Sequence, residues 1–100
     1  MADFDGSKAE LHVLTPGDAL ALRLGIRAVL TAGKRIAAGG YRTTAEQMKR
    51  IEHELAQEAI AAGTMIAADA VPITNDELDA AADLSAEQKV VEILGPARVN

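Results

Sequence analysis

Few residues of this chain have the type and spacing that chemistry requires, and the two histidines are the first to consider. His53 opens the run His-Glu-Leu-Ala-Gln-Glu, which begins like the His-Glu-x-x-His pattern of zinc proteases. The second ligand position of that pattern is occupied by Gln57, and an amide is a poor zinc ligand. The other histidine is His12. We therefore predict no metal site, and we expect His53 to lie on the polar face of a helix.

Two groups of acidic residues have a spacing that catalysis or calcium binding could use. General acid–base catalysis needs a carboxyl group whose pKa is raised in a pocket, and exposed helix acids have no such pocket. A calcium-binding loop needs a glycine and a terminal Glu, and the second group has neither. Acids in the first turn of a helix are expected from the helix dipole alone. The groups are Glu52, Glu54 and Glu58, and Asp76, Glu77, Asp79 and Asp83.

Gly39-Gly40 stands before a helix start, as glycines do in loops that bind phosphate. The Gly-x-x-x-x-Gly-Lys-Ser/Thr spacing and a preceding strand are both missing, so the pair is better explained as a helix stop. The chain has no cysteine, which excludes a thiol nucleophile, a disulfide and a cysteine-ligated zinc. We accordingly predict a protein that is not an enzyme, with no catalytic residue, no metal and no cofactor.

The charged residues are unevenly distributed along the chain. Seven of the ten basic residues lie between positions 23 and 50, where Glu46 is the one acid. The second half of the chain is acidic, and the whole chain has a net charge of −5. An uneven charge distribution gives information about binding partners and association rates, but not about the fold. The basic residues of this segment are Arg23, Arg27, Lys34, Arg35, Arg42, Lys49 and Arg50.

Two interpretations of this asymmetry stay open. In the first, basic side chains on the first helix and around the following turn contact phosphates or an acidic partner, while an acidic cluster makes a second contact. In the second, the basic segment pairs with the acidic second half of the same chain. The first interpretation predicts two partner-binding surfaces, which are Arg23, Arg27, Lys34, Arg42, Lys49 and Arg50, and Asp76, Glu77, Asp79 and Asp83.

The composition predicts a helical protein with a thin core. Alanine accounts for 21 of the 100 residues and aromatic residues for two, and alanine is the best helix former. Small side chains bury little area each, so we expect close helix packing and self-association. The N-terminus has no hydrophobic region of the signal-peptide kind, and no apolar run approaches the roughly 18 residues of a spanning helix. We therefore expect a cytoplasmic protein that does not contact membranes.

A long antiparallel helical hairpin is predicted over residues 16–38 and 44–69. Thr15-Pro16-Gly17-Asp18 has the features of a helix start, and Gly39-Gly40 those of a helix end. Thr43 and Thr44 each begin a capping box, so either can start the second helix. Apolar spacing predicts the faces that enter the core: Leu22, Ile26, Val29, Leu30, Gly33, Ile36 and Ala37 on the first helix, and Met48, Ile51, Leu55, Ala59, Ala62 and Ile66 on the second. Outside these faces lie Leu20, Leu24 and Ile60. We expect the C-terminal helices or the N-terminal arm to cover them; the alternative is an exposed apolar patch suited to a partner.

Two short helices complete the predicted all-α fold. Thr74-x-x-Glu77 starts one over about 75–83, and Ser85-x-x-Gln88 starts another over about 86–94, where Gly95-Pro96 stops it. Residues 1–8 are predicted to be a flexible arm, and residues 9–14 an extended lead-in or a short strand. All of residues 1–100 are predicted to belong to a single domain.

Residues 39–55, Gly-Gly-Tyr-Arg-Thr-Thr-Ala-Glu-Gln-Met-Lys-Arg-Ile-Glu-His-Glu-Leu, resemble the turn and second helix of ribbon-helix-helix antitoxins. In that family a Gly-x-Tyr turn precedes Ser or Thr, an acid and an apolar-patterned helix, and residues 9–14 would correspond to its short strand. The resemblance implies paired strands that enter the DNA major groove and an acidic C-terminal segment that binds a toxin. Glu10 stands where a DNA-facing position calls for a basic or amide side chain, and no functional residue is carried over.

The function expected from these observations is surface binding. We expect a non-enzymatic protein that occupies the surface of another protein or nucleoprotein complex. A small inhibitor encoded by a mobile element, of the anti-CRISPR type, fits this description, and so does an adaptor. A dimeric DNA-binding regulator that uses the basic end of the hairpin is the first alternative, and only there is nucleic acid the partner. A structural subunit of a larger particle is the second alternative.

Overall fold

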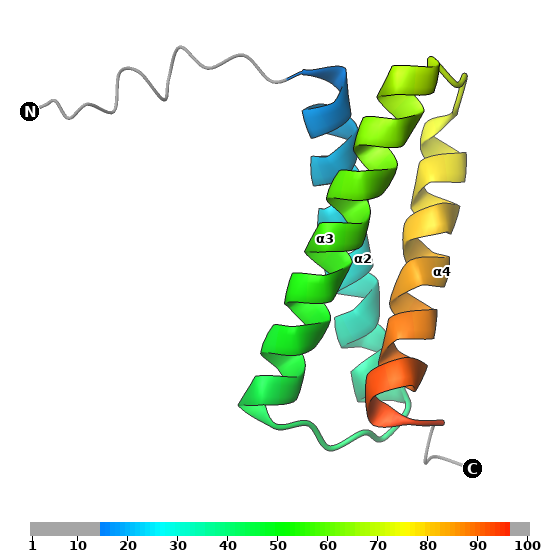
Figure 1. Cartoon of the computed structure of the whole chain (residues 1–100). Helices are drawn as coiled ribbons and strands as arrows, with labels where there is room; N and C mark the ends of the chain where they lie inside the picture. Colours follow the sequence, from blue (N-terminus) through cyan, green and yellow to red (C-terminus); the bar gives the residue numbers. More distant parts are fainter. Residues whose placement is uncertain (1–14, 97–100) are drawn as a thin grey trace, which may run out of the picture.

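The computed structural model describes residues 15–96, and three helices account for most of them (Figure 1). The helices are α2 (Pro16–Ala38), α3 (Ala45–Asp69) and α4 (Asn75–Leu94). α2 and α3 are antiparallel, and α4 runs in the direction of α2. The prediction of an all-α hairpin followed by C-terminal helical structure is therefore confirmed. The predicted arm (1–8) and the predicted strand or lead-in (9–14) lie outside the described residues.

All three helices begin with the same capping box. The side chains of Thr15, Thr44 and Thr74 each accept a hydrogen bond from the backbone N–H three residues later. The side chain at that later position accepts one from the threonine N–H in return. Each box satisfies two backbone donors that a helix start leaves unpaired. Of the two candidate starts for the second helix, the chain uses Thr44.

The two short helices predicted over 75–83 and 86–94 are one continuous helix, α4. Ser85 lies in the middle of α4, so its spacing to Gln88 does not form a capping box. Neither glycine nor proline stands within α4, so nothing removes a backbone hydrogen bond or favours a left-handed residue there. Serine is only mildly unfavourable inside a helix, and the helix continues through it.

The core lies between the three helices and consists largely of alanine and leucine. On α3 the predicted face is the buried one, with Ile51 and Leu55 almost completely excluded from water. α4 packs more extensively on α2 than on α3. The small side chains let the helices pack closely, as the composition predicts. The buried residues are Leu24, Ala28 and Ala32 of α2, Ile51, Leu55 and Ala59 of α3, and Leu78, Ala82, Ala86 and Val90 of α4.

α2 and α3 approach each other closely at Gly63. A Cβ atom placed there would lie 2.6 Å from the carbonyl oxygen of Gly17 and 2.7 Å from the amide nitrogen of Ala21. Contacts this short are essentially never made by real Cβ atoms, and both neighbours are backbone atoms that cannot rotate away. Only glycine therefore fits at this crossing.

The predicted core face of α2 is largely wrong: Val29 and Ile36 pack against the core, but the large apolar row of that face lies nearly opposite to the buried side of the helix. Leu24 is 5% exposed and belongs to the core, whereas Leu22, Ile26 and Leu30 are 55%, 54% and 59% exposed. The prediction chose the face with the largest apolar side chains. In the structure α2 packs between α3 and α4, and at this narrow position its buried turns carry alanine (Ala28 and Ala32). The large apolar row is consequently left on the outside.

Candidate functional site

A row of ion pairs joins α2 to α4. Nη2 of Arg23 lies 3.1 Å from Oδ2 of Asp79, and Nε of Arg27 lies 2.8 Å from Oδ1 of Asp83. Both arginines also donate a second hydrogen bond to the same carboxylate, so each pair is bidentate. Because α2 and α4 run in the same direction, side chains spaced four residues apart on each helix meet in register. A third pair at the end of the row joins Arg35 to Glu87.

These pairs join four of the ten residues predicted to bind a partner. Arg23 and Arg27 belong to the predicted basic surface, and Asp79 and Asp83 to the predicted acidic one. For these residues the structure matches the second interpretation, in which the basic segment pairs with the chain's own acidic half. Their use by an external partner stays a prediction, and it would require the partner to compete with bidentate bonds.

The other six residues lie near the two ends of the molecule. Arg50 pairs with Glu54 on its own helix, with Nε 2.7 Å from Oε2. Lys34, Arg42 and Lys49 form no ion pair within residues 15–96, and they lie toward the end where α2 leads into α3. Asp76 and Glu77 lie in the first turn of α4, at the other end, and the Glu77 side chain is part of the capping box.

Two of the acidic residues in these contacts, Asp83 and Glu54, have pKa values below the ordinary range. Hydrogen bonds from Arg27 and then Thr31, together with the positive charge of Arg27, lower the pKa of Asp83 to about 2. Hydrogen bonds from Arg50 and Lys89 lower the pKa of Glu54. A general acid needs the opposite change, a raised pKa. The two carboxyl groups are therefore tuned to stay ionised.

Lys89 is a buried charged residue that the sequence does not single out. Its side chain is 8% exposed, and its Nζ lies 2.9 Å from Glu54, 2.8 Å from Glu58 and 3.3 Å from Glu92. Hydrogen bonds from Nζ to these carboxylates raise the pKa of Lys89, with Glu58 the largest contributor. The cluster ties α4 to α3, where few other contacts exist. A single lysine in an acidic helix carries no pattern from which this role can be predicted.

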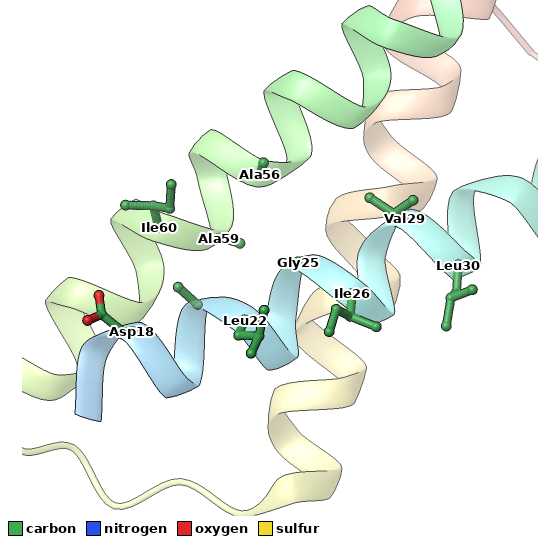
Figure 2. A pocket seen from close by; sticks show the side chains of 10 residues that line it. Asp18, Leu22, Gly25, Ile26, Val29, Leu30, Ala56, Ala59 and Ile60 are labelled. Atoms are coloured by element: carbon green, nitrogen blue, oxygen red, sulfur yellow. The ribbon is translucent and has the colours of Figure 1, made fainter. Parts of the chain in front are cut away.

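An apolar groove of about 740 Å³ lies between α2 and α3. Figure 2 shows Leu22, Ile26 and Leu30 in a row along α2, with Ile60 on α3 at the other side. Smaller residues lie between these side chains, among them Gly25 and Ala59. Apart from Asp18 at one end, every lining residue is apolar. The full lining is Asp18, Ala21, Leu22, Gly25, Ile26, Val29, Leu30, Ala56, Ala59 and Ile60.

The groove is made of residues that the sequence analysis placed in the core. Leu22, Ile26 and Leu30 were predicted to face α3, and Ile60 was predicted to be covered, yet all four are more than half exposed. The signal that could have found the groove is that α2 has two apolar faces. Leu20 and Leu24 lie on one face, and the large row lies nearly opposite. A helix with two apolar faces and one inward side must expose one of them.

Comparison of the chain with models of protein families, with curated proteins and with solved structures gives no match. Within residues 15–96, no three His, Asp or Glu side chains come together in a way that could hold a metal ion. None of the helices in this part of the chain is long and apolar enough to cross a membrane. The groove and the charged ends are therefore the features on which a function can be argued.

Proposed function

We propose that this protein is a non-enzymatic interaction module whose contact surface is the groove between α2 and α3. The observation that carries the proposal is the exposed row of Leu22, Ile26 and Leu30 beside a hollow lined by small residues. Contiguous apolar surface of this kind is costly to leave in water and marks interaction sites. An amphipathic helix from another protein chain has the shape and chemistry to fill such a groove.

The charged residues also support a binding role over a catalytic one. Asp83 and Glu54 are bound by arginine and lysine partners, which lower the pKa values of both carboxyl groups. Such groups are poor proton donors near neutral pH. Meanwhile the groove contains one charged side chain, Asp18, and no histidine. An apolar groove with a single carboxylate at one end, which already accepts a hydrogen bond in the Thr15 capping box, is better suited to protein contact than to catalysis.

A module of this kind acts by occupying a partner's surface. A small inhibitor of a nucleic-acid-binding complex, encoded by a mobile element and of the anti-CRISPR type, would act in this way, and so would an adaptor. The groove provides apolar contact area, while the unpaired charges near the two ends would set the orientation of the partner. A buried apolar centre with a charged rim is the usual anatomy of a protein–protein interface.

Photo-crosslinking in the source cells tests the proposal. A photoreactive amino acid at position 30 lies in the groove, and one at position 88 lies on the exposed side of α4 and serves as the control. We expect protein adducts from position 30, none from position 88, and loss of the adducts when Leu22→Glu is added. Absence of any protein adduct at position 30 would overturn the proposal. Mass spectrometry identifies the attached chain.

A DNA-binding regulator is a second candidate. It is favoured by the basic side chains near the α2–α3 connection that form no ion pair within the described residues. Lys34, Arg42 and Lys49 could contact three phosphates per chain. Three contacts predict that the logarithm of affinity falls with the logarithm of salt concentration at a slope of about −3. A mobility-shift assay with mixed-sequence DNA measures this slope, and absence of binding at low salt rejects the candidate.

A further inference from the structure

The exposed row on α2 is symmetric about Ile26. Leu22 and Leu30 stand four residues before and after it, and Asp18 and Lys34 stand eight residues before and after it. All five side chains are exposed, and successive members are four residues apart. They therefore form one ridge along the helix surface, with an acid at one end and a base at the other. Next to this ridge the same symmetry relates two small exposed residues, Ala19 and Gly33.

A ridge with this symmetry is complementary to a second copy of itself in the antiparallel direction. When two such helices cross with their four-residue ridges aligned, Ile26 of each copy meets Ile26 of the other. Leu22 then faces Leu30 of the second copy, and both Leu–Leu contacts are equivalent. At the two ends Asp18 faces Lys34, again twice. A two-fold dimer requires this kind of self-complementary patch, in which each contact occurs as a symmetric pair.

The distribution of charge over the whole molecule favours the same direction. Asp18, Asp69 and Asp76 lie at the end where α2 and α4 begin, and within residues 15–96 none of them forms an ion pair. The basic residues Lys34, near the C-terminal end of α2, and Arg42, in the α2–α3 connection, lie toward the opposite end, and neither forms an ion pair within the described residues. An antiparallel pair places the acidic end of one copy beside the basic end of the other. A parallel pair would instead bring like charges together.

From this symmetry we infer that the occupant of the groove is a second copy of this chain, related by a two-fold axis at Ile26. The inference rests on the proposed function, because it names the partner of the same surface. In the dimer, the row of Leu22, Ile26 and Leu30 of each copy, which forms the α2 side of the groove, packs against the same row of the other copy. The floor of small residues, Gly25 and Ala21 among them, lets the two α2 axes approach to about 8–10 Å.

Sedimentation equilibrium of the purified full chain tests the association. We expect wild type to be a dimer at micromolar concentration, and Ile26→Glu to weaken it at least about 100-fold because two carboxylates would be buried at the axis. The control is Leu84→Glu, which introduces the same charge at a 56% exposed leucine of α4 outside the groove. The control should remain a dimer. A monomeric wild type, a larger particle, or a dimer that Ile26→Glu leaves intact would each overturn the inference.

Single cysteines test the direction and the register, since the chain has no cysteine of its own. A disulfide needs Cα atoms about 4.4–6.8 Å apart. Ile26→Cys should cross-link two copies on oxidation, whereas Lys34→Cys should not, because its two Cα atoms would be about 24 Å apart. Cross-linking at both positions would indicate a parallel pair and contradict the antiparallel dimer. Groove adducts with a different protein only, in cells, would reject the second copy while supporting the interaction module; no adduct at all would reject both.

Discussion

At the scale of single residues, Lys89 shows how a charge can be buried in a protein with a thin core. Its ammonium group is surrounded by Glu54, Glu58 and Glu92, and these carboxylates replace the water that burial removes. The carboxylates themselves remain partly exposed. The cluster therefore combines a desolvated cation with solvated anions, and removing the cation leaves three like charges near one another.

Lys89→Met tests this arrangement because it keeps the length of the side chain and removes the charge. We expect a loss of about 1–3 kcal/mol in the free energy of unfolding at pH 7. The loss should shrink at pH 4, because protonation of the glutamates relieves their repulsion. Urea unfolding of both proteins at the two pH values measures this difference.

The control for Lys89→Met is Lys49→Met, at an exposed lysine of α3 that has no ion pair within the described residues. Surface changes of this kind usually alter stability by less than about 0.5 kcal/mol. An equal loss for Lys89→Met at pH 7 and pH 4 would show that packing of the lysine stem, and not its charge, explains the burial.

At the scale of the helices, Gly63 determines how closely α2 and α3 approach. We expect Gly63→Ala to lower the free energy of unfolding by about 1–3 kcal/mol, because the added methyl group meets the backbone of Gly17 and Ala21. Gly33→Ala is the matched control, since nothing lies within 4 Å of its added Cβ. There alanine should stabilise α2 by up to about 1 kcal/mol. Both changes are made in a chain that also carries Ile26→Glu. Because Ile26→Glu is expected to prevent dimerisation through α2, the comparison then measures the stability of the single chain.

The end of α3 provides a second test, in which the substitution is expected to raise the free energy of unfolding and not to lower it. Ala70 has φ 51° and ψ 41°, a left-handed conformation that favours glycine. We expect Ala70→Gly to raise the free energy of unfolding by about 0.5–1 kcal/mol, after the greater freedom of glycine in the unfolded chain is subtracted. Two residues earlier, Ala68 is exposed and helical, so Ala68→Gly should be destabilising. Thermal unfolding of both variants checks the contrast; loss of stability in both would contradict it.

Helix starts could be predicted from the sequence because capping is a local effect. Thr44 and Thr74 form the capping boxes that were predicted, and Thr15, which was predicted as an N-cap, forms one with Asp18. Ser85 has the same local pattern, yet the helix passes through it. The difference is that the chain leaves the helical conformation shortly before Thr44 and Thr74, at Gly39-Gly40 and at the Val71-Pro72 turn. Capping patterns therefore locate a start only where a break already exists.

At the scale of the whole molecule, the orientation of α2 could not be predicted, because it depends on two neighbours at once. The residue pattern contains both the Leu24 face and the Ile26 face, and apolar size favours the second. Packing between α3 and α4 selects the first, and Arg23 and Arg27 pair with α4 on the side that this rotation gives them. The candidate site follows from this choice. The groove exists because the larger apolar face was left outside.

Charge was the feature most readily read from the sequence, and most of it is used inside the molecule. The arginines of α2 and the acids of α4 were visible as opposite clusters, but their register depends on the parallel placement of the two helices. Once Arg23 and Arg27 are paired with Asp79 and Asp83, the charged side chains left without a partner among the described residues lie near the two ends of the molecule. These residual charges still give the molecule opposite ends, which is what an antiparallel pair needs.

The same ion pairs predict where the molecule opens first in acid. α4 is attached mainly to α2, and Asp83 is the acceptor at the centre of that attachment. Because the pKa of Asp83 is about 2 in the folded chain and 3.8 ordinarily, its stabilisation is present above about pH 4 and is lost as the pH falls toward 2. We therefore expect hydrogen-exchange protection factors between pH 5 and pH 2.5 to fall more in α4 than in α2 and α3. Asp83→Asn should already reduce protection of α4 at pH 5 and show a smaller further decrease. A uniform fall across the three helices would instead mean that the chain unfolds as one cooperative unit and that the α2–α4 ion pairs do not determine which helix separates first.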